Sequence, residues 1–256
     1  MIGNDNYSLE IRQKQSGVKQ MGIQAGVSDT QNFPYEDEEV IVEYCKLESG
    51  EELNQSKVDI HRFLVFGTGR GYVNNMILTP GKLLIIPPEI PLTINADERC
   101  GINFFIVRVK GARFGIREIA LHDRVPLTPF YEEKIIAPKG TPFNVDSVLN
   151  LGEVIVPPGI KTSKHTLGVN ERYLVFGGPA AMFLDDVQHF VTMGNIVHIP
   201  SGTIQSIKNT SLQPLRFYCL CTPPFTPDTY EGIKSNEIPN EFDLDAWWKA
   251  NSQEFI

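Results

Sequence analysis

A seven-residue segment near residue 61 recurs near residue 171, and this internal repeat constrains the fold more than any other feature. His61-Arg-Phe-Leu-Val-Phe-Gly67 and Glu171-Arg-Tyr-Leu-Val-Phe-Gly177 are identical at five of seven positions. Two further pairs match in the same order: Gly50 with Gly159, and Gly81–Pro87 with Gly194–Pro200. Three ordered matches at nearly constant spacing indicate a tandem duplication. This alignment pairs His61 with Glu171.

Each copy has the pattern of short strands separated by turns. In the second copy the expected strands are 152–157, 170–177, 180–184, 187–192, 195–199, 203–209 and 214–221. The intervening segments PPG, GGP, LDD, MGN and PSG hold residues that favour tight reversals. This spacing is typical of β-sandwiches and barrels. Only Asp243–Ala250 has the pattern of a helix, with an aspartate as its N-cap.

Composition narrows the classes of partner and compartment. The net charge of −8 opposes a nucleic-acid groove or an anionic membrane surface as the main partner. The longest apolar runs, 83–88 and 102–109, are too short to span a bilayer. The polar N-terminus predicts no signal peptide. Four cysteines without a disulfide spacing predict reduced thiols and a cytoplasmic protein.

The second copy resembles the two sequence motifs of the cupin superfamily. The first motif is matched by Gly159, His165, Glu171 and Gly178, and the second by Gly194, Pro200, Gly202 and Asn209. The resemblance implies an all-β bicupin: two tandem cupin double-stranded β-helix (jelly-roll) barrels with a short C-terminal helix. The expected segments are an N-terminal extension at 1–37, a degenerate barrel at 38–110, a linker at 111–150, a second barrel at 151–222 and a tail at 223–256.

The resemblance also implies where a metal ion would bind. Metal-binding cupins commonly use two histidines and the glutamate of the first motif with a histidine of the second. Here His165 and Glu171 keep two of these places, while Leu167 and Gln205 take the others. The predicted metal ligands are therefore His165, Glu171 and Gln205, which would hold one divalent ion (Fe, Mn, Ni or Zn) weakly. A site without metal stays open as the alternative.

Side-chain alternation extends the predicted pocket along the strands. If Glu171 points into the barrel, Tyr173 does too, whereas Arg172 points out. A carboxyl group beside an imidazole in an apolar barrel forms an acid–base pair, and burial raises the pKa of the carboxyl group. The predicted catalytic residues are Glu171, His165 and Tyr173. The predicted substrate-binding residues are Gln205, Leu167, Asn209, Phe217 and Cys219.

Other histidines and the first copy offer weaker candidates. His198, His189 and His122 are expected to serve packing or to face solvent rather than to bind a ligand. At the ligand places of the first copy the alignment puts Ser56, Val58, His61 and Leu92. The first barrel is therefore expected to be structural: it stabilises the second barrel through a shared buried face, or it completes the rim of the second barrel's pocket.

The predicted function is that of a small-molecule enzyme acting in the second barrel. A His–Glu pair with a tyrosine suits isomerase, dehydratase, cyclase or lyase chemistry through proton transfer. A metal-dependent dioxygenase and a non-catalytic small-ligand-binding bicupin are the alternatives, and a polar cluster left from a lost metal site is the bland interpretation. The expected partner is a small organic substrate (a sugar, an organic acid or a secondary metabolite), with neither nucleic acid nor membrane. A homodimer is compatible with the sequence.

Overall fold

The protein is described by a computed structural model, which covers residues 26–29, 34–74, 76–80, 82–111, 120–122, 128–129, 134–135, 149–224 and 229–232. These residues form β-strands and turns and contain no α-helix. The expected helix at Asp243–Ala250 lies outside them. Within the same ranges, no helix long and apolar enough to cross a membrane is found.

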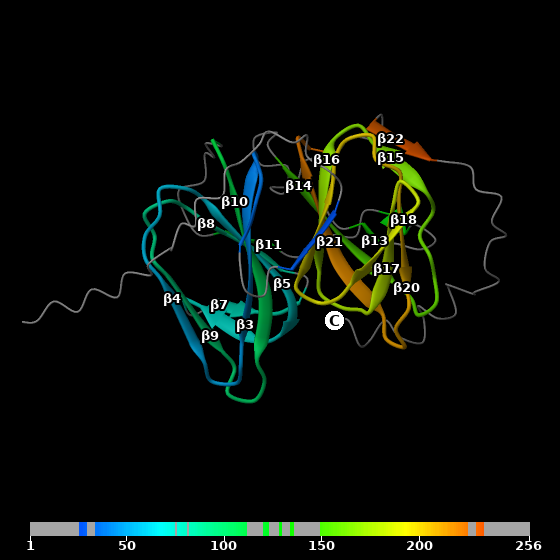
Figure 1. Cartoon of the computed structure of the whole chain (residues 1–256). Helices are drawn as coiled ribbons and strands as arrows, with labels where there is room; N and C mark the ends of the chain where they lie inside the picture. Colours follow the sequence, from blue (N-terminus) through cyan, green and yellow to red (C-terminus); the bar gives the residue numbers. More distant parts are fainter. Residues whose placement is uncertain are drawn as a thin grey trace, which may run out of the picture.

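The first barrel pairs a six-stranded sheet, ordered β11-β8-β5-β10-β3-β2, with a four-stranded sheet, ordered β4-β9-β6-β7 (Figure 1, left). Its strands are β2 (Tyr35–Glu36), β3 (Val40–Leu47), β4 (Glu52–Gln55), β5 (Arg62–Gly69), β6 (Gly71–Val73), β7 (Met76–Leu78), β8 (Leu83–Ile86), β9 (Leu92–Ala96), β10 (Ile102–Val109) and β11 (Ala120–His122). All pairings within it are antiparallel, as in a jelly roll.

The second barrel pairs two five-stranded sheets, ordered β1-β19-β16-β21-β14 and β18-β17-β20-β15-β22. Its strands are β1 (Gly26–Asp29), β14 (Asn150–Val156), β15 (His165–Leu167), β16 (Asn170–Val175), β17 (Ala180–Leu184), β18 (Val187–Val191), β19 (Asn195–Ile199), β20 (Gln205–Asn209), β21 (Leu215–Thr222) and β22 (Tyr230–Gly232). The short strands β12 (Thr128–Pro129) and β13 (Lys134–Ile135) pair with each other. The all-β prediction is confirmed for the described residues.

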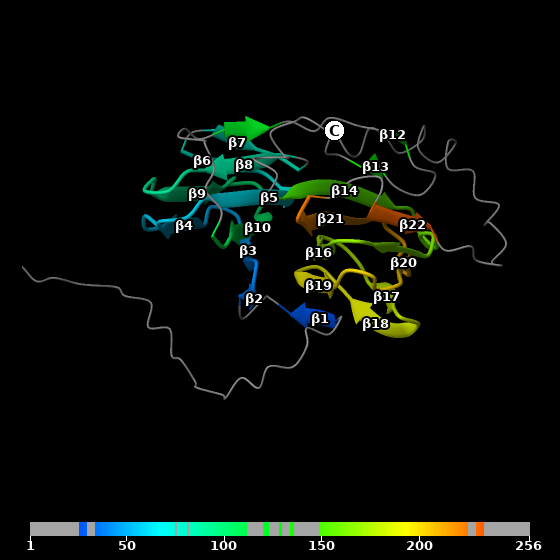
Figure 2. The same ribbon diagram turned by 90° about the horizontal axis from the view of Figure 1, so that it is seen from above.

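Two segments outside the repeat join the second barrel. Strand β1 precedes the first barrel in sequence, yet it pairs with β19 of the second barrel, where Figure 2 shows it. Strand β22 comes from the C-terminal segment and pairs with β15. The segment before the first barrel therefore pairs with the second barrel. The segment after the second barrel adds a strand beside His165.

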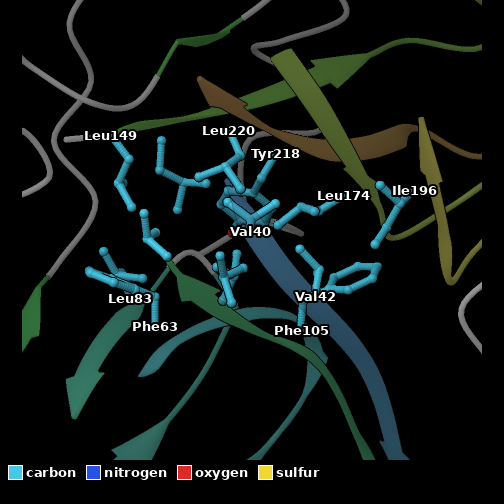
Figure 3. Close-up of a cluster of buried hydrophobic side chains, with 14 of the residues drawn as sticks. Val40, Val42, Phe63, Leu83, Phe105, Leu149, Leu174, Ile196, Tyr218 and Leu220 are labelled. Atoms are coloured by element: carbon cyan, nitrogen blue, oxygen red, sulfur yellow. The ribbon is translucent and has the colours of Figure 1, made fainter. Parts of the chain in front are cut away.

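Three of the four hydrophobic clusters in the described part of the chain follow from strand alternation. One fills the first barrel and one fills the second. The third lies between the barrels (Figure 3) and takes residues from both, including Val40, Val42, Phe63, Phe105, Leu174, Ile196, Tyr218 and Leu220. Both barrels are thus buried on a shared face, as the sequence predicted. Because this face is apolar, burying it stabilises the pair at about 25 cal/mol per Å².

Polar contacts complete the shared face. The side chain of Arg172 is 1% exposed and forms ion pairs with Asp37 and Glu39, which lie between β2 and β3 of the first barrel. On the other side, the Arg216 guanidinium donates to the carbonyl oxygen of Gly67 at 2.9 Å, and the Tyr218 hydroxyl donates to that of Phe66 at 3.0 Å. These contacts fix the second barrel against the first.

The matched letters of the repeat lie on opposite faces of the two barrels. On β5, Leu64 belongs to the inner cluster and Phe63 to the cluster between the barrels. On β16 the pattern is reversed, because Tyr173 is inside and Leu174 lies between the barrels. A shift of one residue moves every side chain of a strand to the other face.

The pairing of His61 with Glu171 is therefore wrong, and Arg62 takes the glutamate's place in the first barrel. Arg62 lies opposite Ile86 and Arg108, just as Glu171 lies opposite Ile199 and Cys221. The first-motif histidine is shifted too: Gln55, rather than Ser56, lies opposite Leu92 as His165 lies opposite Gln205.

Candidate active site

Glu171 is the centre of a polar cluster inside the second barrel. Its side chain is buried where β15, β16, β20 and β21 meet. The Gln205 amide nitrogen donates to its Oε2 at 2.7 Å, and the Cys221 thiol donates to its Oε1 across 3.8 Å. The sequence places Glu171 and Gln205 34 positions apart, and strand pairing brings them together.

Strand register explains why these side chains meet. His165 on β15 lies directly opposite Gln205 on β20, and Glu171 on β16 lies directly opposite Cys221 on β21. Residues directly opposite on neighbouring strands point to the same face, with Cβ atoms about 4.5–5.5 Å apart. The cluster therefore takes one side chain from each of four strands.

The ring of His165 is held by two contacts. Its Nδ1 lies 3.0 Å from the carbonyl oxygen of Ser163. Because a carbonyl oxygen only accepts hydrogen bonds, we assign the proton of the neutral ring to Nδ1, which leaves Nε2 as a base. The ring stacks on Tyr230 of β22, with centroids 5.2 Å apart and planes at 25°. Tyr230 was missed by the sequence analysis, since no motif marks it.

Burial raises the pKa of the Glu171 carboxyl group. The nearby His165 and the hydrogen bonds from Gln205, Cys219 and Cys221 lower it only in part. Burial also raises the pKa of the Cys221 thiol, and the Glu171 charge raises it further. The thiol therefore stays protonated as a donor, while the carboxyl group is disposed to hold a proton.

Of the other predicted residues, Tyr173, Phe217 and Leu167 lie in hydrophobic clusters, whereas the Asn209 side chain binds backbone carbonyl groups. Tyr173 and Phe217 lie in the inner hydrophobic cluster with ring centroids 4.4 Å apart. Tyr173 is one inward position from Glu171 on β16, and Phe217 is two inward positions from Cys221 on β21. Leu167 packs with Val169 and Cys221. Asn209 is not brought to Glu171: its amide nitrogen donates to the carbonyl oxygens of Val156 and Gln213. Its side chain therefore supports the backbone.

The other histidines differ in position. His198 is buried on the sheet face toward Tyr35, with ring centroids 6.0 Å apart, and so lies at the boundary between the barrels. His189 is partly exposed on β18. The side chain of His122 lies outside the described residues.

The donor set at Glu171 does not fit the four-ligand metal site that the family motif implies. In the described part of the chain, no three His, Cys, Asp or Glu side chains gather as metal ligands. Gln205 turns its amide nitrogen, a group that cannot ligate, toward the carboxyl group of Glu171. Leu167 has no ligand atom. The ligand set His165, Glu171 and Gln205 stays a prediction.

One atom in the cluster lacks a partner. Gln205 is 1% exposed, and its Oε1 accepts no hydrogen bond from the residues that the structure describes. Leaving such an atom unpaired costs about 1–3 kcal/mol. A hydroxyl or N–H group of a bound molecule would satisfy it.

Solved structures show which fold this arrangement belongs to. An oxalate decarboxylase superposes with a TM-score of 0.62 at 13% identity, over 83% of this chain and 81% of that one. The formate complex of Lactobacillus farciminis oxalate decarboxylase gives 0.61 at 12%, over 82% and 89%. AerE from Microcystis aeruginosa gives 0.58 at 11%, over 74% and 90%. The chain has the bicupin fold. At these identities the likeness shows the fold of the bicupin alone.

Sequence comparison adds one relative. This chain is 34% identical over 86 residues to the uncharacterized protein MJ1618 of Methanocaldococcus jannaschii. The matched segment covers 33% of this chain and 69% of that protein. It therefore belongs to the same family as that protein. A scan against protein-family models finds no match.

Proposed function

We propose that the second barrel catalyses proton transfer on a small organic substrate, in an isomerase-, dehydratase-, cyclase- or lyase-like reaction. The observation that carries the proposal is the buried Glu171, whose carboxyl group faces Gln205 and a cysteine thiol and lies near His165. Perturbed carboxyl groups of this kind are common at sites of acid–base chemistry.

Glu171 and His165 suit opposite roles. A carboxyl group with a raised pKa holds a proton that it can donate, whereas the Nε2 of a neutral His165 can accept one. In this proposal His165 removes a proton from the substrate and Glu171 returns one at a second atom. Either residue can start the reaction, depending on the direction.

Substrate orientation is assigned to the neighbouring side chains. The unpaired Oε1 of Gln205 accepts a hydrogen bond from a substrate hydroxyl or N–H group. Tyr173 and Phe217 form the apolar floor, and Tyr230 covers His165 from β22. A small polar molecule with at least one such donor, as in a sugar or a hydroxy acid, matches this combination.

The test is deuterium exchange, because proton abstraction from carbon exchanges C–H for C–D in heavy water even when no net product forms. The bicupin is incubated in heavy water with a panel of sugars and organic acids, and mass spectrometry detects the added mass. We expect exchange into one compound, slowed about 10²–10⁴-fold by Glu171→Gln and by His165→Gln. Arg70→Gln, a change at an exposed surface position, is the control. Absence of exchange from the whole panel would contradict the proposal.

The alternatives predict other readouts. A metal-dependent dioxygenase would consume oxygen, and its purified protein would contain stoichiometric metal that both His165→Ala and Glu171→Ala remove. A non-catalytic binder would gain thermal stability from one compound of the panel without exchange or oxygen uptake. Elemental analysis of protein purified without a His-tag therefore accompanies the exchange assay.

We also propose a cytoplasmic homodimer. The cysteines Cys45, Cys100, Cys219 and Cys221 are free, as reducing conditions would keep them. Val187 and Phe190 are exposed apolar side chains on β18, an edge strand of its sheet. Exposed edges with apolar side chains favour association. Light scattering should give twice the monomer mass, and Phe190→Glu should return the monomer.

A further inference from the structure

In the first barrel, a buried arginine stands where the second barrel has its glutamate. Arg62 is fully buried on the inner face of β5 and lies directly opposite Arg108 of β10. Like charges directly opposite on neighbouring strands repel each other. A barrel with a purely structural role would gain stability from apolar residues at these two positions, so the pair needs a separate explanation.

Arg62 has no carboxylate partner among the residues that the structure describes. Its Nη1 donates to the Gln55 side-chain oxygen and to the Ser56 carbonyl oxygen, both at 3.4 Å, and its Nη2 donates to the Ile90 carbonyl oxygen. All three acceptors are neutral. A buried charge without a counter-charge is costly, and proteins pair such charges or leave them for a ligand.

The groups around Arg62 leave one positive charge in excess. Arg108 forms an ion pair with Glu43, at 2.7 Å between Nη1 and Oε1, and Gln55 reaches the other oxygen of Glu43 at 3.4 Å. Glu43 therefore compensates one of the two guanidinium groups. Burial lowers the pKa of Arg62, and the charge of Arg108 lowers it further. The same cause favours an added negative charge at this place.

Two donors are unused. Within the described ranges of the chain, the Nε–H groups of both Arg62 and Arg108 are buried without a hydrogen-bond partner. Buried polar groups in native structures are nearly always paired, so each such exception calls for a reason. Two guanidinium donors beside one surplus charge have the chemistry that binds an oxyanion.

We propose that the first barrel binds a small monovalent carboxylate between Arg62 and Arg108. The planar carboxylate group has two oxygens that match guanidinium N–H donors. One surplus charge suits a monoanion better than a dianion such as hydrogen phosphate. The side chains of Arg108 and Glu43 keep 15% and 25% of their surface exposed. This site is independent of the chemistry proposed for Glu171.

The experiment measures the melting temperature of the full-length bicupin in rising sodium acetate, with sodium chloride at equal ionic strength as the reference. A ligand that binds the native state raises the melting temperature in proportion to RT ln(1 + [L]/Kd). We expect a saturable rise with acetate, confirmed by calorimetric titration with one acetate per chain. Inorganic phosphate should give a smaller rise than acetate.

Variants assign the effect to the first barrel. Arg62→Met and Arg108→Gln should each abolish the acetate response, and Arg108→Gln serves alone if the more buried change prevents folding. Arg70→Gln, in the same barrel but exposed and paired with Asp97, should leave the response unchanged, as should Glu171→Gln. No response of the wild type, a stronger response to phosphate, or loss of the response in Glu171→Gln alone would overturn the proposal.

Discussion

Corresponding strands pair in the same way in the two barrels, but the side chains at the matching inner positions have opposite charge types. In the second barrel this layer holds Glu171 opposite Cys221, a carboxyl group among neutral donors. In the first it holds Arg62 opposite Arg108, with one carboxylate for two guanidinium groups. The duplication therefore left one barrel with a buried carboxyl group and the other with two guanidinium groups that share one carboxylate.

The arginine that the repeat has in both copies also lies in two different environments. Arg62 and Arg172 are aligned in the sequence, yet Arg62 points into its barrel and Arg172 points between the barrels. Arg172 is compensated by Asp37 and Glu39, whereas Arg62 has only neutral acceptors. Identical residues in a repeat thus do not imply equal roles, because one residue of register decides the face.

The largest expected effect separates these two arginines. Arg172→Met should lower the free energy of unfolding by about 3–5 kcal/mol, because it leaves two carboxylates without their buried partner. Arg62→Met, measured without acetate, should change it by about 1 kcal/mol or less, since the lost hydrogen bonds are offset by removal of a buried, uncompensated charge. Urea unfolding followed by circular dichroism gives both values. Equal costs for the two variants would break the comparison.

A second pair tests the packing between the barrels. Gly67 and Gly177 end the two matched segments, but a Cβ on Gly67 would overlap the ring of Phe176. That ring is held edge-on by Phe105, at 4.9 Å between centroids, and by Tyr218, at 5.6 Å. Gly67→Ala should therefore cost about 1–3 kcal/mol through overpacking.

Gly177→Ala is the matched control. Its nearest neighbour would be the Arg216 backbone nitrogen at 3.3 Å, a tight but tolerable contact. We expect a cost below about 1 kcal/mol in the same urea assay. A larger cost for Gly177→Ala than for Gly67→Ala would show that Phe176 yields and that the shared face is looser than its contacts indicate.

Much of the fold and part of the site were accessible from the sequence, because the signals are local. Motif spacing placed His165, Glu171 and Gln205, and alternation placed Tyr173 inside and Leu174 outside. These predictions need only the distance between residues along one strand. The pairing of β16 with β21 then adds Cys221, which lies directly opposite Glu171.

What the sequence hid depends on register across strands. Gly67 has no partner residue on β10, because the pairing of β5 with β10 shifts register between Asn103 and Phe104. The identical residues of the repeat give no sign of this extra residue in β5. The alignment therefore put His61, rather than Arg62, in the place of Glu171. Tyr230 was missed for another reason: it reaches His165 through β22, a strand of three residues after the repeat, and nothing local predicts its pairing with β15.

A third and smaller effect is the pH dependence of two glutamates. Burial raises the pKa of Glu171, so its favourable contribution is full below its ordinary pKa of 4.5 and is lost as the pH rises through the folded-state pKa. Glu171→Gln stays neutral and should gain stability relative to the wild type as the pH rises.

Glu39 should behave in the opposite way. Partial burial favours a higher pKa, but the hydrogen bond from Thr222 and the hydrogen bond and charge of Arg172 lower it overall. Its contribution is present above its ordinary pKa and is lost as the pH falls. The penalty of Glu39→Gln should therefore shrink toward acid pH. Urea unfolding between pH 4 and pH 8 checks both trends, and parallel trends would contradict the assignment.

The smallest effect concerns one hydroxyl group at the shared face. Tyr218 and Phe105 hold corresponding positions in the two barrels. Tyr218 lies three residues before Cys221 on β21, and Phe105 lies three residues before Arg108 on β10. The Tyr218 hydroxyl donates to the Phe66 carbonyl oxygen at 3.0 Å and lies 3.3 Å from the Glu153 carboxylate. Tyr218→Phe makes the second barrel resemble the first here and should cost about 1 kcal/mol, the net value of a buried hydrogen bond.

Tyr44→Phe is the control for that change. Its hydroxyl contacts Asn103 at the same 3.0 Å, but the pair is partly exposed within the first barrel, so water replaces the lost partner. We expect a cost of less than about 0.5 kcal/mol in the same urea assay. If the two variants cost the same, the Tyr218 hydroxyl adds nothing to the contact between the barrels. That contact would then rest on its apolar cluster and on Arg172, and the Tyr-to-Phe difference between the two copies would carry no energetic consequence.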